Sequence, residues 1–448
     1  MVPTLPQHAI ASSPPARALT RKAVVVQSGA RDAYQVARAL ADAGMLETLV
    51  TDLFWPSDRP WARALQARLP ASLCAVLAQR SEPQLPSDRV RLCAVYGLLT
   101  MLLDKLPRVP LPLRRRVTRS ADANLGRSAG RLANRTGAGL ISYSYYGFDA
   151  FSNYPHPGTL FQLHPHPASM RRILTEELNA HPDCASSLRQ EWELSLPEED
   201  FQHLVRETTM ARHFLAASSF TRSTLVEHGA PAGSVNVVPY GVDSSRFTPS
   251  PYRRSVPGSP LRLLFVGRIN QRKGIKYLLE ALRLVRSPNV HLTVCGRVVD
   301  SLDLFKSFST SGRSQIDIRP DVSAQELVAQ YQAADLFVFP SVAEGFGQVL
   351  LESLASGLPV LSTTHTAAPD LIEHGQQGFV VEPRRPDLLA AHIDWALTHR
   401  SDLADMGIQA RLRAEQFTWA RFRSGIVSAV GQFLVSDGTT AETSSPHV

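Results

Sequence analysis

The chain has 448 residues, of which 44% are hydrophobic and 19% charged. This composition is typical of a globular protein and excludes a wholly disordered one. The length suits two domains of roughly 200 residues each. The formal net charge is +7, and residues 108–135 alone hold eight arginines against one aspartate. The positive charge is therefore local, which favours contact with an anionic surface or acceptor over generally basic behaviour.

The cysteines and the N-terminal segment bear on the cellular compartment. Four cysteines, at positions 74, 93, 184 and 295, form no Cys-x-x-Cys pair, so we expect reduced structural thiols in a cytoplasmic protein. Residues 1–20 are rich in Pro and Ala without an apolar stretch, which predicts a flexible tail and no signal peptide. The longest apolar run, Leu92–Leu103, is too short to span a bilayer.

The first half of the chain alternates between strand-like and helix-like segments. An apolar run at Lys22–Gln27 predicts a strand, a helix through Gly44 follows, and Leu49–Leu53 predicts a second strand. Residues 60–135 are mostly helix-like. Two strands are expected next, at Leu140–Tyr145 and Thr159–Leu163. A helix that runs into a short strand is expected at Arg206–Ser219, followed by a helix at Thr221–Gly229 and a strand at Val235–Pro239. The pattern predicts a doubly wound, Rossmann-like domain over residues 21–240.

The second half repeats this alternation. The stretch Pro249–Pro260 is rich in Pro, Ser and Arg, as expected of a domain linker. Five strands alternating with helices are expected at Leu261–Val266, Val290–Val294, Gln315–Ile318, Asp335–Phe339 and Leu358–Ser362. They predict a second doubly wound domain over residues 241–415. Trp419–Phe433 predicts a closing helix, and residues 436–448 a flexible tail.

Residues 335–363 carry the clearest chemical signal. The strand Asp335–Phe339 leads into a loop with Glu344 and the turn Gly345–Gly347, and the following helix carries Glu352. The loop thus lies at the carboxyl end of a parallel strand, where open α/β sheets bind ligands. Backbone amides that open a helix point at anionic oxygens. Two carboxylates beside such amides suit a ligand with both hydroxyls and phosphates, such as a nucleotide sugar.

This segment resembles the retaining glycosyltransferases of family 4, whose signature is a Glu-x7-Glu pair in a Glu-Gly-Phe-Gly context. Glu344 and Glu352 match that pair. The resemblance continues in three further segments, Val237–Asp243, Leu263–Gly274 and Glu415–Trp419. Residues 210–430 follow the family pattern, whereas residues 60–200 hardly do. Four matches in the right order are a far more specific signal than the glutamate spacing alone.

The resemblance implies the GT-B fold, an α/β architecture of two Rossmann-like domains that face each other across a cleft. A C-terminal helix, here residues 416–435, crosses back to the N-terminal domain. The implied activity is that of a hexosyltransferase-like enzyme of polysaccharide biosynthesis. It transfers a sugar, with retention, from a nucleotide-diphosphate donor to a glycan, lipid-linked or small-molecule acceptor. No cofactor or metal is implied, and no Asp-x-Asp signature stands out.

The resemblance also assigns residues to the donor. Arg268 and Lys273 would hold the diphosphate, Glu344 the hydroxyls of the donor sugar and Glu352 the ribose. Five further residues are expected to bind the donor: Gly267, Gly296, Gly345, Phe346 and Gly347. For Gly296, a plain turn glycine is an equally good interpretation.

The acceptor side is less well marked. His164 and His166 end a strand where family members often place a histidine near the acceptor, although the Pro-flanked turn explains both equally well. Arg31 follows the first strand, where the family commonly has a glycine-rich loop, and is the predicted phosphate contact from the N-terminal domain. The segments Gln348-Val349 and 366–370 depart from the family pattern beside the donor sugar, so sugar identity does not carry over.

Two alternatives stay open. A GT-B protein could bind a glycan or nucleotide sugar as an assembly partner without turnover, although the intact glutamates and cations argue against it. The run Leu92–Leu103, followed by Arg114–Arg116, suits a peripheral contact with an anionic membrane at its inner face, or else an ordinary core helix beside a solvated one. Nucleic acid is not expected as a partner, because the basic cluster lacks interleaved aromatic residues.

Overall fold

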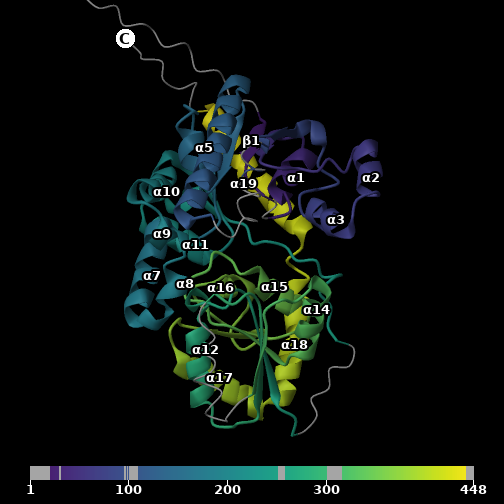
Figure 1. Cartoon of the computed structure of the whole chain (residues 1–448), viewed down its shortest axis with the longest axis vertical. Coiled ribbons are helices and arrows are strands. Elements are labelled where there is room, and N and C mark those ends of the chain that lie inside the picture. The colour runs from purple at the N-terminus through teal and green to yellow at the C-terminus, as the bar shows by residue number, and fades with distance from the viewer. Residues whose placement is uncertain are drawn as a thin grey trace, which may run out of the picture.

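The computed structural model describes residues 21–29, 32–94, 97, 99, 109–250, 258–299 and 315–439. Two parallel sheets form two α/β domains that lie one above the other in Figure 1. Each sheet has its own buried apolar core. The predicted architecture of two doubly wound, Rossmann-like domains is therefore confirmed.

The N-terminal sheet has seven strands in the order β3-β2-β1-β4-β5-β6-β7. Their bounds are β1 Ala23–Val26, β2 Leu46–Thr51, β3 Val90–Leu92, β4 Gly139–Tyr143, β5 Gly158–Gln162, β6 Ala211–Ala216 and β7 Val235–Val237. The strand β3 was not expected from the sequence. It lies at the edge of the sheet and is half-buried to exposed along its length, so it has no apolar run to reveal it.

The C-terminal sheet has six strands in the order β10-β9-β8-β11-β12-β13. They are β8 Leu261–Val266, β9 Val290–Cys295, β10 Gln315–Arg319, β11 Leu336–Phe339, β12 Val360–Thr363 and β13 Gly378–Val381. The first five match the expected strands, whereas β13 was missed. In both sheets the order reverses between two central strands, β1 and β4 or β8 and β11, and such switch points open a crevice at the carboxyl ends of the strands.

Helices flank both sheets. Those of the first half are α1 Gln35–Asp42, α2 Pro60–Gln66, α3 Ala71–Ala78, α5 Leu111–Thr136, α6 Gly147–Phe151, α7 Pro167–Ala180, α8 Ala185–Leu188, α9 Trp192–Ser195, α10 Glu198–Met210 and α11 Ser219–Glu227. Those of the second half are α12 Ile275–Leu284, α14 Ala324–Ala333, α15 Gln348–Ala355, α16 Ala368–Leu371, α17 Pro386–Thr398, α18 Arg400–Ala414 and α19 Trp419–Thr439.

The last helix, α19, returns to the N-terminal domain, as Figure 1 shows in yellow. Phe422, Ile426 and Val430 recur at helical spacing and are buried in the N-terminal core. The crossing helix implied by the family resemblance is therefore present, and it runs to Thr439 rather than to residue 435.

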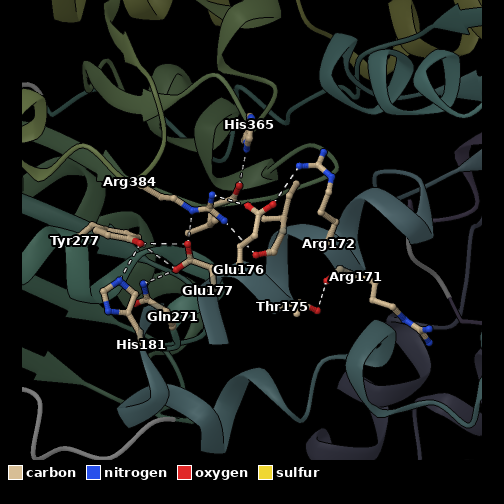
Figure 2. Close-up of polar contacts among 12 residues, drawn as sticks. Arg171, Arg172, Thr175, Glu176, Glu177, His181, Gln271, Tyr277, His365 and Arg384 are labelled. Carbon is tan, nitrogen blue, oxygen red and sulfur yellow. Dashed lines mark hydrogen bonds and ion pairs between the residues drawn. The ribbon is translucent and has the colours of Figure 1, made fainter. Parts of the chain in front are cut away.

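Helix α7 ties the two domains together from the other direction. Ile173 and Leu174 of this helix are buried in the core of the C-terminal domain. Beside them the buried carboxylate of Glu177 accepts hydrogen bonds from Gln271 Nε2 at 2.9 Å and from Tyr277 Oη at 3.1 Å, and it pairs with Arg384. Figure 2 shows these groups converging on Glu177. Because a buried carboxylate is stable only when fully bonded, this network favours one relative placement of the domains.

The predicted basic patch is partly neutralised within the fold. In α5, Arg119 and Arg127 both pair with Asp149, at 2.7 and 3.2 Å. Arg115 donates to the carbonyl of Ser195 at 2.8 Å. These arginines therefore hold α5 against its neighbours. The other part of the predicted membrane contact, Leu92–Leu103, lies mostly outside the described residues.

Candidate active site

A cavity of about 460 Å3 lies between the domains, at the carboxyl ends of both sheets. Its N-terminal wall comes from the residues after β1 and β5, and its C-terminal wall from the loop and helix after β11. The lining residues are Asp32, Ala33, Leu163, His164, Tyr240, Val242, Asp243, Arg246, Phe247, Glu344, Phe346, Gly347, Gln348, Glu352 and Trp419. The structure thus brings both glutamates of the Glu-x7-Glu pair to one cavity, with His164 on the opposite wall.

Glu344 occupies the loop between β11 and α15. Its carboxylate accepts a hydrogen bond from Arg272 Nη1 at 3.1 Å and pairs with the ammonium of Lys273. Burial opposes ionisation of Glu344, but Lys273 and Arg272 outweigh it and hold the pKa well below its usual range. Glu344 is therefore a fixed negative charge at the cavity before any ligand binds.

Lys273 and Arg272 follow β8, the strand next to β11, which explains why they meet Glu344. Burial lowers the pKa of Lys273 to about 8, although Glu344 acts against this. Arg272 is buried between Glu344 and Glu191, whose carboxylate lies 3.2 Å from Arg272 Nε. Arg272 was missed from the sequence, where the only signal was its place in a basic run beside Lys273.

Arg268, the other cation assigned to the diphosphate, lies apart from this cluster. Its side chain is exposed on the loop after β8, and it is not among the cavity-lining residues. Its charge is still close enough to lower the pKa of Lys273. Of the two cations predicted to hold the diphosphate, Lys273 is buried and ion-paired with Glu344, whereas Arg268 faces solvent.

Glu352 sits in α15 in a different environment. Its carboxylate accepts a hydrogen bond from Tyr331 Oη at 2.9 Å. Burial raises the pKa of Glu352, and the bond from Tyr331 and the charge of Arg246 reduce the shift. Glu344 is thus held as an anion by cations, whereas Glu352 is held by a neutral hydroxyl donor.

Two of the predicted glycines occupy close backbone contacts. A Cβ on Gly345 would lie 1.9 Å from the carbonyl oxygen of Leu163, so the loop of Glu344 touches the end of β5 directly. A Cβ on Gly296 would lie 2.0 Å from the carbonyl oxygen of Gly267. Packing alone therefore accounts for glycine at both positions. Gly347 has a φ of 85° and precedes α15 as its N-cap.

The two histidines after β5 separate in the structure. His164 lines the cavity, and its ring packs edge-on against Tyr145 with centroids 6.2 Å apart. His166 is buried, caps α7 by accepting from the Ala168 N–H at 3.2 Å, and stacks on His228 at 4.0 Å. Burial, reinforced by His228, lowers the pKa of His166 to about 3. His166 is thus a neutral helix cap away from the cavity, contrary to its predicted place beside the acceptor.

The loop after β1 contributes Asp32 and Ala33 to the cavity. Asp32 accepts a hydrogen bond from Tyr143 Oη at 2.6 Å, and burial raises its pKa. Neither residue was singled out from the sequence. Arg31, the predicted phosphate contact from this loop, lies outside the described residues.

Metal and membrane features were also sought within the described part of the chain. There, no group of three or more His, Cys, Asp or Glu side chains is arranged to hold a metal ion. None of the described helices has the length and apolar character required to cross a bilayer.

Comparison with known proteins gives a family likeness for the C-terminal wall. Residues 253–413 match the family model described as Glycosyl transferases group 1. This segment is therefore similar to group 1 glycosyl transferases. It contains Arg268, Lys273, Glu344 and Glu352.

Relatives of known name are similar over a comparable stretch. A D-inositol 3-phosphate glycosyltransferase of Arthrobacter sp. (strain FB24) is 34% identical over 228 residues, covering 47% of this chain and 53% of that protein. A GDP-mannose-dependent alpha-(1-6)-phosphatidylinositol monomannoside mannosyltransferase of Mycobacterium tuberculosis (strain CDC 1551 / Oshkosh) is 30% identical over 237 residues, covering 49% and 60%. The chain spans about half the length of the curated relatives that it matches.

Solved structures extend the likeness to the whole chain. Sucrose-phosphate synthase from Thermosynechococcus elongatus aligns with a TM-score of 0.62 and 17% sequence identity, covering 93% of this chain and 99% of the other. At this identity the likeness shows the fold alone. The GT-B fold implied by the sequence resemblance is confirmed.

Proposed function

We propose that this protein is a retaining glycosyltransferase of family 4 that transfers a sugar from a nucleotide diphosphate to an acceptor bound at the N-terminal wall. One observation carries the proposal: Glu344 and Glu352 line a single interdomain cavity, and Glu344 is paired with cations of the segment that is similar to group 1 glycosyl transferases. A glycan, a lipid-linked sugar or a small molecule would serve as acceptor.

The C-terminal wall would bind the donor. Negative charge builds on the leaving diphosphate during transfer, and fixed cations stabilise it best where water is excluded. Lys273 is buried beside Glu344, and Arg268 is exposed on the loop after β8; both are assigned to the phosphates. Glu344, ionised in advance, would accept hydrogen bonds from the sugar hydroxyls, and Glu352 from the ribose.

Neither glutamate need act as a nucleophile. In the front-face route usually proposed for retaining enzymes of this fold, the leaving phosphate accepts the proton of the acceptor hydroxyl. Catalysis then rests on positioning and on stabilisation of the phosphate. His164 faces Glu344 across the cavity and is assigned to orienting the acceptor.

A lipid-linked acceptor, reached at the cytoplasmic face of a membrane, is supported by the mycobacterial relative, whose name includes phosphatidylinositol monomannoside. Arg114–Arg116 supports it less, because Arg115 is engaged with the carbonyl of Ser195. Nucleic acid is not proposed as a partner.

Isothermal titration with a panel of nucleoside diphosphates and nucleotide sugars tests the donor site. Wild type should bind one base selectively, and the variant Arg268→Ala/Lys273→Ala should lose that binding. The single variant Arg268→Ala, which alters an exposed side chain, should weaken it by about tenfold and guards against misfolding of the double variant. If wild type binds no member of the panel, the non-catalytic assembly partner is favoured instead.

Metal independence has its own test. Turnover should be unchanged by EDTA, because the proposed site stabilises the phosphates with side-chain cations. Loss of turnover in EDTA and its recovery with a divalent ion would contradict this part of the proposal.

A further inference from the structure

Helices α2 and α3 form a hairpin with an unusual surface, which we call the α2–α3 surface. Trp61 and Leu65, one turn apart in α2, are 59% and 45% exposed, and Leu73 and Val76 of α3 are 47% and 42% exposed. In Figure 1 the two helices stand at the side of the N-terminal domain. Large apolar residues exposed together on two successive helices mark an interaction site.

The charged residues within the hairpin itself are all arginines. Residues 59–81 contain four arginines and no aspartate or glutamate. Arg63 and Arg68 are exposed, and neither enters an ion pair with any residue that the structure describes. Arg80 pairs with Asp52, and Arg59 lies 3.6 Å from Asp58.

A second exposed apolar pair serves as a comparison for α2 and α3. Ile408 and Leu412 of α18 are 60% and 51% exposed. Their helix carries charges of both signs, and Arg411 pairs with Glu415 at 2.7 Å. Exposure alone is therefore common to both places, whereas uncompensated positive charge distinguishes the α2–α3 surface.

The hairpin is held as a folded platform. Trp55 Nε1 donates to Gln66 Oε1 at 2.9 Å, and Cys74 Sγ donates to the carbonyl of Gln66 at 3.2 Å, so α2 and α3 are bonded through one residue. The rings of Trp55 and Trp61 pack edge to face with centroids 6.0 Å apart. The apolar side chains are thus presented on ordered helices, and binding would cost little ordering.

We infer that the α2–α3 surface docks the protein on an anionic lipid bilayer. Tryptophan with aliphatic side chains suits the boundary between headgroups and acyl chains, and arginines beside them pair with anionic headgroups. The absence of acidic residues between 59 and 81 fits such a membrane better than a protein partner of mixed charge. The inference deepens the proposed function, on which it rests, because a bilayer presents a lipid-linked acceptor.

The position of the surface relative to the cavity supports this reading. At the end of the hairpin, Arg80 donates to both oxygens of Asp52, at 3.1 and 3.0 Å, and Asp52 accepts from the Gly29 N–H at 2.8 Å. Gly29 belongs to the loop that continues to Asp32 at the cavity wall. The hairpin is therefore bonded to the loop of the acceptor wall, the wall that would receive a lipid-linked acceptor from the membrane.

Co-sedimentation with vesicles tests the inference. The full chain is mixed with phosphatidylcholine vesicles with and without phosphatidylglycerol. Wild type should partition onto the anionic vesicles. Trp61→Ser/Leu65→Ser should weaken partition by at least roughly tenfold, and Arg63→Gln/Arg68→Gln by roughly thirtyfold on anionic vesicles only. The matched variant Ile408→Ser/Leu412→Ser should bind as wild type does.

Three outcomes would overturn the inference. These are failure of wild type to bind vesicles, equal losses in the α18 variant, and a wild-type dimer in light scattering that Trp61→Ser/Leu65→Ser dissolves. Nucleotide titration on the same samples separates this from the proposed function. Intact nucleotide binding without vesicle binding defeats only the membrane surface, whereas absent nucleotide binding defeats the proposed function itself. The substituted side chains are exposed, so folding should persist.

Discussion

The two walls of the interdomain cavity differ in how their chemistry is held in place. On the C-terminal wall, Glu344 is fixed by Lys273 and Arg272, and Glu352 by Tyr331. On the N-terminal wall, His164 packs edge-on against Tyr145, and Asp32 is held by Tyr143. The first wall is organised by charge before a ligand arrives, as a site for a charged donor requires. The second has fewer fixed charges, which suits the selection of an acceptor by shape.

The largest effect is expected where that charge organisation is broken. Glu344→Gln removes a contact to the donor sugar, leaves Lys273 without its buried counter-charge and leaves Arg272 paired with Glu191 alone. Transfer should fall by about a thousandfold, and the free energy of unfolding by about 3 kcal/mol. Turnover assays and urea unfolding measure the two.

The matched control for this variant is Glu415→Gln, which breaks the exposed pair with Arg411. It should change the free energy of unfolding by less than about 1 kcal/mol. Equal effects of the two substitutions would show that the C-terminal wall is not organised by its charges.

The N-terminal wall is tested through its histidines. His164→Asn should lower turnover by about a hundredfold, because the acceptor hydroxyl loses an orienting partner, with nucleotide affinity unchanged. His166→Asn should leave turnover at neutral pH as in wild type, since Asn can replace His166 as the cap of α7. Release of nucleoside diphosphate in the presence of a lipid extract measures turnover. The reverse pattern would exchange the roles of the two residues.

Lys273 offers a smaller effect that depends on pH. Its pKa lies at about 8, and the protonated form is the one that binds a diphosphate. Nucleotide affinity should therefore fall as the pH rises through 8, and be about tenfold lower at pH 9 than at pH 7. Titration calorimetry at pH 7, 8 and 9 measures this change in nucleotide affinity. Lys273→Arg, which stays charged, should abolish the pH dependence of nucleotide affinity. If affinity in this variant still falls with pH as in wild type, Lys273 does not bind the phosphates.

The smallest effect concerns the stability of the N-terminal domain, through the buried His166. Burial lowers the pKa of His166 to about 3 in the folded chain. In the unfolded chain His166 takes up a proton near pH 6.5, whereas in the folded chain it stays neutral at that pH. The contribution of neutral His166 to the free energy of unfolding is therefore fully present above pH 6.5 and is lost as the pH falls below it. Between pH 6.5 and 5.5 wild type should lose about 1 kcal/mol more than His166→Asn. Parallel stability curves would contradict the assignment.

The sequence predicted the fold well where burial leaves a pattern. Central strands such as Leu336–Phe339 and Ala23–Val26 are buried on both faces and appear as continuous apolar runs. The edge strand Val90–Leu92 has no such run, because it is half-exposed. The other missed strand, Gly378–Val381, is the edge strand of the second sheet. Both strands that escaped detection therefore lie at sheet edges.

The same contrast holds for the cavity. Glu344, Glu352 and Lys273 were found because they belong to local motifs of the segment that is similar to group 1 glycosyl transferases. Arg272 stands in the same run as Lys273, but its contact with Glu344 forms only when β8 and β11 pair in the folded chain. Asp32 likewise reaches the cavity only in the folded chain. The bonds of Glu177 to Gln271 and Tyr277 join residues 94 and 100 positions apart, and no local pattern encodes such a contact.

Hydrogen–deuterium exchange with the nucleoside diphosphate selected by titration tests the division of the cavity most directly. We predict protection in residues 268–274 and 344–352, which carry the cations and both glutamates, with exchange at Leu163 and His164 unchanged. Protection confined to the N-terminal wall would contradict it, because the nucleotide would then bind opposite the charges assigned to it.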